Sequence, residues 1–144
     1  MRSARLESDK ALAYGTFRLS LGINELMHGL VRLPILVAFA ANTARNFEST
    51  ILPVWFVYGF GLILPLLEAL IGIALILGLL TRWALVTASL LMATLIFGTA
   101  LRSDWATVGL QMIYVVSYFL ALIFIEYNRY SFDRLFENRK RPSL

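Results

Sequence analysis

Long apolar runs separated by short polar joints dominate this sequence. A helix that crosses roughly 30 Å of hydrocarbon needs about 20 mostly apolar residues, and four runs are long enough: 12–40, 54–80, 83–101 and 106–127. The joints at 81–82 and 102–104 are short and polar, whereas the link at 41–53 is longer and ends in a proline suited to starting a helix. Because short joints force neighbouring helices to be antiparallel, we predict an all-α, integral membrane four-helix bundle with up-down-up-down order, in one domain covering residues 1–144.

The segment that follows the last apolar run, residues 128–141, has a different pattern. Ser131 is a residue type that caps helices, and Asp133 would favour the first turn of the helix that follows. Three apolar residues share one face of that helix: Phe132, Leu135 and Phe136. We predict a short interfacial helix that lies on acidic lipid. A helix that docks onto a partner protein is the alternative.

Composition agrees with a membrane protein and excludes several kinds of chemistry. Hydrophobic residues make up 59% of the chain and charged residues only 15%, whereas soluble domains average about 25% charged residues. The chain has no cysteine, which excludes disulfides, thiolate metal sites and dithiol redox chemistry by the chain itself. It has one histidine, which excludes a haem held by two of its own histidines. We therefore expect no haem or metal ligand set within this chain.

Basic residues are divided unevenly between the two sides that this topology creates. Membrane proteins concentrate arginine and lysine on the cytoplasmic side. One side would hold only Arg45 and Arg102. The other side would hold Arg2, Arg5, Lys10, Arg82, Arg129, Arg134, Arg139, Lys140 and Arg141. We therefore expect both termini in the cytoplasm. The lipid bilayer, and not nucleic acid, is the expected partner, because no exposed basic face is left once the helices lie in lipid.

The first apolar run carries four ionisable residues on one side. Arg18, Glu25 and Arg32 are spaced seven apart, and His28 lies between the last two. At 100° per residue the four span about 80° of the helix circumference, so they form one polar stripe. Each such group costs about 2.5–3.5 kcal/mol inside a bilayer on insertion scales. The stripe must therefore face the interior of the bundle.

The depth of these residues predicts a polar site in the middle of the membrane. If each helix is centred in the bilayer, Glu25 and His28 lie near the midplane, and Glu68 of the second helix lies at the same level. Further polar groups fall in the outward half of the bundle: Arg32, Gln111 and Tyr114. Pro34 also falls there, and because it has no N–H it leaves a backbone carbonyl free as an acceptor.

Two interpretations of this cluster stay open. In the structural interpretation the groups satisfy one another, with Arg18 and Arg32 paired to Glu25 and with Glu68 neutralising Arg32 or His28. Polar bonds in membrane bundles average only about 0.6 kcal/mol, so such a cluster is a poor stabiliser. We therefore favour a site that binds a ligand or handles protons. For Arg18, nearer the cytoplasmic end, a side chain that reaches toward the interface is an equal alternative.

The stretch from Leu64 to Met92 resembles the DoxX family. That family has a glutamate in its second helix, a glycine four residues later and a Gly-Leu-x-Thr-Arg turn followed by an alanine and a methionine. The corresponding residues here are Glu68, Gly72, Gly78, Leu79, Thr81, Arg82, Ala84 and Met92. The first helix, with Arg18, Gly22 and the segment 28–33, and the tail 129–136 are similar too. Arg32 stands where the family often has lysine.

The resemblance implies a four-helix bundle that takes part in membrane redox reactions, as in the small membrane subunit of thiosulfate:quinone oxidoreductase. We accordingly predict a subunit of a quinone-linked oxidoreductase in a bacterial or archaeal cytoplasmic (inner) membrane, with quinone or a small reductant bound in the outward half of the bundle. The candidate catalytic residues, which would supply protons, are His28, Glu68 and Glu25. The candidate cofactor-binding residues are Arg18, Arg32, Gln111 and Tyr114.

Electrons would have to come from outside the chain, because it has no electron carrier of its own. We therefore expect a protein partner in a membrane complex, or a bound reductant such as thiosulfate. The alternative function is a non-catalytic subunit that anchors or assembles a membrane complex. A small proton-coupled carrier is the least favoured function, since four short helices lack the broken repeats of transporters.

Overall fold

The computed structural model describes residues 2–140, with side chains described from 5 to 136. Arg141 lies outside the described residues, as do the side chains of Arg2, Arg139 and Lys140, which entered the charge comparison. The elements are α1 (Arg2–Arg32), η1 (Leu33–Ile35), α2 (Leu36–Arg45), α3 (Val54–Leu77), α4 (Thr81–Leu101), α5 (Trp105–Ile123), η2 (Ile125–Tyr127) and α6 (Phe132–Lys140). Residues 2–140 contain no strand, so the chain is all-helical over this range.

Four helical segments are long and apolar enough to cross a membrane, as predicted. They are Arg5–Arg45, Val54–Leu77, Thr81–Leu101 and Trp105–Ile123. Their outer surfaces are apolar, since many large hydrophobic side chains are exposed along all four segments. Such a surface would aggregate in water, and it is suited to contact with lipid chains.

The first membrane segment is longer than predicted and is not a single helix. It was expected as one helix over 12–40, but α1 begins at Arg2 and ends at Arg32, and a short 3-10 turn around Pro34 separates it from α2. Proline has no N–H to donate and clashes with the preceding helical turn. The chain therefore bends at Pro34, and α2 extends to Arg45 within the range predicted as a link.

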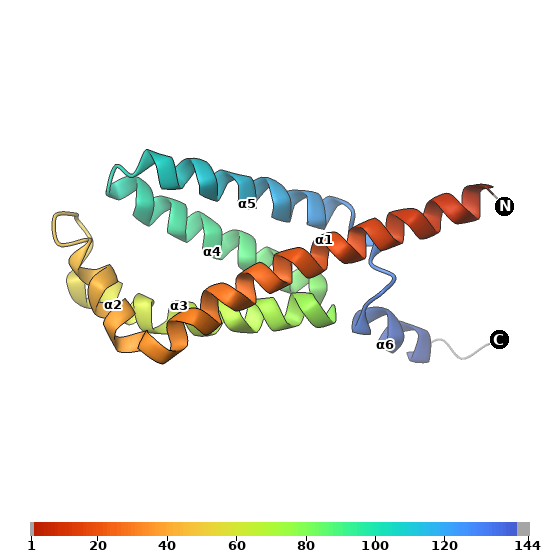
Figure 1. Cartoon of the computed structure of the whole chain (residues 1–144), viewed down its shortest axis with the longest axis horizontal. Helices are drawn as coiled ribbons and strands as arrows, with labels where there is room; N and C mark the ends of the chain where they lie inside the picture. The colour runs from red at the N-terminus through yellow and green to blue at the C-terminus, as the bar shows by residue number, and fades with distance from the viewer. Residues whose placement is uncertain (1, 141–144) are drawn as a thin grey trace.

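The helices form two arms that meet at one end of the molecule (Figure 1). One arm consists of α1 and α2 packed on α3, and the other is the hairpin of α4 and α5. α1, α3, α4 and α5 run in alternate directions, and the arms spread apart toward the end that holds α2 and the α4–α5 turn. We call this the open end, and the end at the α3–α4 turn the joined end.

The two long helices of the first arm approach each other closely at Gly72. A Cβ atom placed on Gly72 would collide with the backbone of Leu26, so no other residue fits without moving α1. Lipid chains are as apolar as leucine, so helices in a membrane gain stability from such close packing more than from the hydrophobic effect. The small residue at 72 therefore fixes the distance between α1 and α3.

A dry core fills the part of the bundle nearest the joined end. Its largest fully buried side chains include Leu75, Leu85 and Tyr118, which come from both arms. This core holds α3, α4 and α5 together where the arms converge. Toward the open end the space between the arms is not filled in this way.

The C-terminal segment closes the joined end by polar contacts. Arg18 is buried, and its guanidinium donates to Asn128 Oδ1 and to the carbonyl oxygen of Tyr130, each at 2.9 Å. Asn128 donates in turn to the hydroxyl of Thr81 at the start of α4, at 3.0 Å. We call these contacts, together with those of Asp133, the C-terminal clamp.

Asp133 lies in the first turn of α6, as predicted, and its side chain also caps a second helix. Its carboxylate oxygens accept from the backbone N–H groups of Leu80 at 2.7 Å and Thr81 at 2.8 Å, at the start of α4. Its own N–H donates to the carbonyl of Gly78, whose positive φ of 66° ends α3 and suits glycine. The prediction for Ser131 is confirmed, since its hydroxyl accepts from the N–H of Arg134 at 3.3 Å in the first turn of α6.

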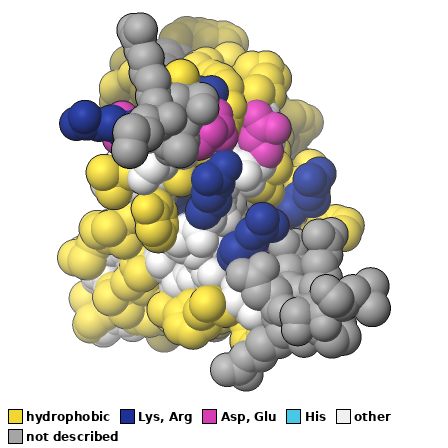
Figure 2. Space-filling view, turned by 90° about the vertical axis from the view of Figure 1, so that its right-hand side faces the viewer, with side chains coloured by type: hydrophobic (Ala, Val, Ile, Leu, Met, Phe, Trp, Pro, Cys, Tyr) yellow, Lys and Arg dark blue, Asp and Glu magenta, His cyan; other side chains and the backbone are white. Residues whose placement is uncertain are grey.

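The surface of the joined end is polar and carries basic side chains, as Figure 2 shows. Polar contacts link α1 to the C-terminal segment: Arg129 bonds to Glu7 of α1 at 3.1 Å, and Lys10 of α1 bonds to Glu7 and to the hydroxyl of Tyr127. On α6 the apolar residues Phe132, Leu135 and Phe136 are exposed. This arrangement is what a helix lying at a lipid–water interface requires.

At the open end Asp104 begins α5. Its carboxylate accepts from the hydroxyl of Thr107 at 2.7 Å and from the Thr107 N–H at 3.2 Å. These two bonds hold the pKa of Asp104 below its ordinary value, the hydroxyl having the larger effect. The cap fixes the point at which the α4–α5 hairpin turns.

Candidate functional site

A cavity of about 840 Å³ lies between the arms toward the open end. All five helices from α1 to α5 contribute to its lining. Its walls are largely apolar and include five phenylalanines: Phe39, Phe47, Phe56, Phe60 and Phe97. Polar side chains gather where the cavity approaches the core. Cavities of this size, with apolar walls and a few polar groups, are typical of sites for small molecules and cofactors.

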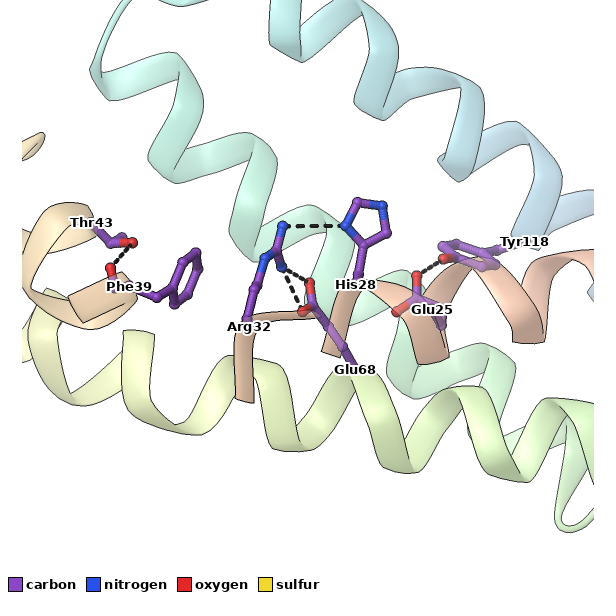
Figure 3. Close-up of polar contacts among 7 residues, drawn as sticks. All are labelled: Glu25, His28, Arg32, Phe39, Thr43, Glu68 and Tyr118. Atoms are coloured by element: carbon purple, nitrogen blue, oxygen red, sulfur yellow. Dashed lines mark hydrogen bonds and ion pairs between the residues drawn. The ribbon is translucent and has the colours of Figure 1, made fainter. Parts of the chain in front are cut away.

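Arg32 and Glu68 form an ion pair across α1 and α3 (Figure 3). Arg32 Nη1 lies 2.6 Å from each carboxylate oxygen of Glu68. The Arg32 guanidinium also lies over the ring of Phe39, at 4.9 Å from its centre. Glu68 is only 5% exposed, so its charge depends on Arg32 for compensation. The structure thus realises one of the pairings considered for these residues, and Arg32 does not pair with Glu25.

His28 extends this pair. Its Nδ1 lies 3.2 Å from Arg32 Nη2 (Figure 3). A guanidinium has only donors, so Nδ1 must be the acceptor and the proton of the neutral imidazole is placed on Nε2. His28 lines the cavity and is exposed. Its Nε2–H is therefore the group that this cluster offers to a ligand.

Glu25 lies on the same helix but belongs to a different contact. It accepts a hydrogen bond from the hydroxyl of Tyr118 on α5 (Figure 3). Glu25 is 5% exposed and Tyr118 is fully buried. Among the described residues no cation forms an ion pair with Glu25. This bond joins the two arms where the cavity meets the core, since Glu25 lines the cavity and Tyr118 belongs to the core.

Two predicted residues of α5 line the opposite wall of the cavity. The Tyr114 hydroxyl lies 3.4 Å from Asn24 Oδ1, a long hydrogen bond to α1. Gln111 donates through Nε2 to the Thr99 hydroxyl at 3.1 Å, and its buried Oε1 has no partner among the described residues. Gln111 therefore keeps one free acceptor beside the cavity.

Arg18 does not belong to this cavity, which corrects the prediction that it binds the ligand. It does not line the cavity, and its guanidinium is bonded to Asn128 and Tyr130 in the C-terminal clamp. Helical periodicity places Arg18 on the same side of α1 as Glu25, but it cannot show that a distant segment returns to bind it. Arg18 serves to close the joined end.

Exposed residues line the cavity on the side where α1 faces α5. His28 on α1 and Leu110 and Ile113 on α5 line it, and all three are exposed at the surface. α1 and α5 touch through few residues, and the bond between Asn24 and Tyr114 crosses the space between them. A ligand can therefore reach His28 from the side.

Polar residues that were not predicted include Asn24, which lines the cavity, and Tyr118, which bonds to Glu25. A signal for Tyr118 existed, because Gln111, Tyr114 and Tyr118 follow each other at spacings of three and four and so share one face of a helix. Asn24 adjoins the predicted Glu25 and had no signal of its own. The phenylalanine walls could not be assigned, since phenylalanine also suits lipid-facing positions.

Comparisons with protein-family models, with curated proteins and with solved structures give no match. The class of protein therefore follows from the fold and the cavity of this chain. The length and composition of four helices define it as a multi-pass helical membrane protein. It contains a cavity lined by apolar and polar side chains. Among the side chains described, residues 5–136, no three His, Asp or Glu side chains group closely enough to hold a metal ion.

Proposed function

We propose that this chain is a quinone-binding membrane subunit of an oxidoreductase, similar to DoxX-type subunits. The observation that carries the proposal is the cavity itself, which combines aromatic and aliphatic walls with hydrogen-bonding groups at one end. A quinone has the matching shape and chemistry: a flat ring with two carbonyl oxygens, joined to an apolar tail.

Each polar group has a definite part in this proposal. The Nε2–H of His28 donates to one carbonyl oxygen of the ring, and Arg32, fixed by Glu68, keeps the imidazole in the donating tautomer. The free Oε1 of Gln111 accepts from the ring once a carbonyl has become a hydroxyl. The phenylalanine walls contact the ring and the first part of the tail.

The side opening supports a ligand that is dissolved in the membrane. A quinone partitions into the bilayer, and an entrance beside His28 lets the ring enter while the tail stays among lipid chains. Electrons come from a partner subunit or a soluble reductant, and the chain's own residues bind the ring and move protons. We also propose that the joined end faces the cytoplasm, since the basic side chains gather there (Figure 2).

The test is the quinone content of the protein purified in mild detergent from membranes that contain quinone. We expect quinone to co-purify with the unaltered chain and to fall at least tenfold in His28→Ala. Thr16→Ala is the matched control, because Thr16 lies on the same helix, is exposed and bonds only within α1. Circular dichroism verifies that both variants are folded. An equal quinone content in His28→Ala and in the control would contradict the proposal.

A specific observation keeps the anchoring function as a second candidate. Arg32 and Glu68 neutralise each other without any ligand, as a purely structural pair would. In that case a helix of a partner protein occupies the side opening. Loss of a co-purifying protein in His28→Ala, with unchanged quinone content, would favour this function.

A further inference from the structure

We infer that Glu25 is protonated in the folded protein and that the Glu25–Tyr118 pair, and not Glu68, is the proton donor of the cavity. Two carboxyl groups that line one cavity, those of Glu25 and Glu68, thus have different protonation states. Its second half, proton transfer to a ligand, rests on the proposed function. Its first half does not, because it concerns the chain without any ligand.

The environments of the two carboxyl groups differ sharply. Glu68 has Arg32 Nη1 at 2.6 Å from both of its oxygens, a contact that requires the carboxylate to be charged. Glu25 has a phenol and no ion pair within the described part of the chain. An isolated charge in a low-dielectric interior is costly, and a carboxyl group avoids this cost by keeping its proton. Two carboxyl groups in such contrasting surroundings take different roles.

No neighbouring helix supplies a charge that would keep Glu25 ionised. On its own helix the guanidinium of Arg32 is already bound to Glu68 and His28. From α3 the facing charge is Glu68, which disfavours a second negative charge nearby. From α5 the facing groups are the neutral phenols of Tyr114 and Tyr118. α4 has no ionisable residue between Arg82 and its end at Leu101.

The geometry shows where the proton is held. The hydroxyl of Tyr118 donates to Oε1 of Glu25. In Figure 3 the second oxygen of Glu25 points away from Tyr118, on the side of Arg32 and Glu68. A proton on that oxygen therefore faces the cavity. Tyr118 is a positioning residue, because it holds the carboxyl group in this orientation without touching the cavity itself.

The proton transfer balances when the ligand is reduced by a partner protein that carries electrons. As a carbonyl oxygen of the quinone gains electrons, the O–H bond of Glu25 breaks and an O–H bond forms on the ligand. The new carboxylate is held by the hydrogen bond from Tyr118, and it regains a proton from water that enters at the open end. Each turn moves one proton through Glu25, and water that enters the cavity supplies the second proton, while the Nε2–H of His28 only donates a hydrogen bond to the ring.

Infrared spectroscopy tests the inference on the full chain, reconstituted in lipid without quinone near neutral pH. We expect the carbonyl stretching band of a protonated carboxylic acid, which shifts in D₂O. The band should be absent in Glu25→Gln and retained in Glu68→Gln. Tyr118→Phe should keep the band but move it to higher frequency, because the carbonyl loses a hydrogen bond. If Tyr118 had a merely structural role, the frequency of the band would not change.

Other outcomes overturn the inference or separate it from the proposed function. A protonated Glu25 is refuted if the band is absent from the unaltered chain. It is also refuted if the band is lost in Glu68→Gln and not in Glu25→Gln. If Glu25→Gln does not fold, the frequency shift in Tyr118→Phe decides. When quinone is added and then reduced, Glu25 should lose its proton, and the band should return to full intensity only after Glu25 is reprotonated. Because Glu25 is the proton donor, Glu25→Gln should slow quinone reduction at least tenfold. A protonated Glu25 in a chain that binds no quinone would refute the proposed function alone.

Discussion

At the scale of single residues, Arg32 organises the cavity. One guanidinium neutralises Glu68, fixes the tautomer of His28 and packs on Phe39. These contacts do not use all five N–H donors of a guanidinium, and Arg32 lines the cavity, so its role in binding a ligand stays a prediction. Its position at the end of α1, next to Pro34, brings it within reach of α3.

The ion pair of Arg32 and Glu68 leads to a prediction on stability. Arg32→Leu and Glu68→Leu should each lower the free energy of unfolding by about 3–5 kcal/mol, because each leaves an uncompensated charge in the membrane interior. The double variant should be less destabilised than either single variant, since it leaves no charge. Unfolding in SDS, followed by circular dichroism, measures all three. Additive losses in the double variant would show that the two residues do not act as a pair.

Part of this site could be predicted from the sequence. Helical spacing places Glu25, His28 and Arg32 on one side of a helix, and the depth of Glu68 in the second apolar run brings it to their level. The choice of partners could not be predicted, because side chains of this length reach several groups. Tyr118 could not be singled out, because it is uncharged and an uncharged tyrosine in an apolar run does not by itself mark a site.

At the scale of helices, close packing of α1 on α3 sets the width of the first arm. It depends on the lack of a side chain at Gly72, which helical spacing alone does not distinguish from the other glycines of the chain. Spacing of small residues is a weak signal, since such pairs are common in membrane helices. A glycine is required for packing only where the backbones of two helices come close together, and the sequence does not show where that is.

Gly72→Ala should lower the free energy of unfolding by about 1–3 kcal/mol, because its Cβ would push against the backbone of Leu26. Gly59→Ala is the matched control: it lies on the same helix, and a Cβ there would meet nothing within 4 Å. We expect the control to be neutral or slightly stabilising. The same SDS titration compares them, and equal effects of the two substitutions would rule out a close approach at Gly72.

At the scale of the whole molecule, the number and approximate limits of the membrane segments could be predicted, because they follow from apolar length alone. The division into two arms could not, since it depends on which helices contain residues small enough to pack tightly. Pro34, where the first segment is interrupted, could be seen in the sequence, but the prediction drawn from it was only that a backbone carbonyl is left free as an acceptor. In the structure it also redirects α2 along α3 at the open end.

The proposed orientation predicts which end of the molecule reagents reach from outside the cell. The chain has no cysteine, so single cysteines can be introduced without a background. Ser49→Cys, exposed at the open end, should react with a membrane-impermeant maleimide in intact cells. Glu126→Cys, exposed at the joined end, should react only after the cells are permeabilised. The reverse labelling pattern would invert the proposed topology.

The C-terminal clamp has a consequence for biosynthesis. Arg18 is separated from its partners Asn128 and Tyr130 by 110 and 112 residues, so all of α1 to α5 must leave the ribosome before this arginine is bonded. Until then the newly made helices can insert but cannot be locked together at that end. A nascent chain that stops short of Asn128 would keep a buried cation without its acceptors, a defect that membrane proteases could use to distinguish unfinished copies from finished ones.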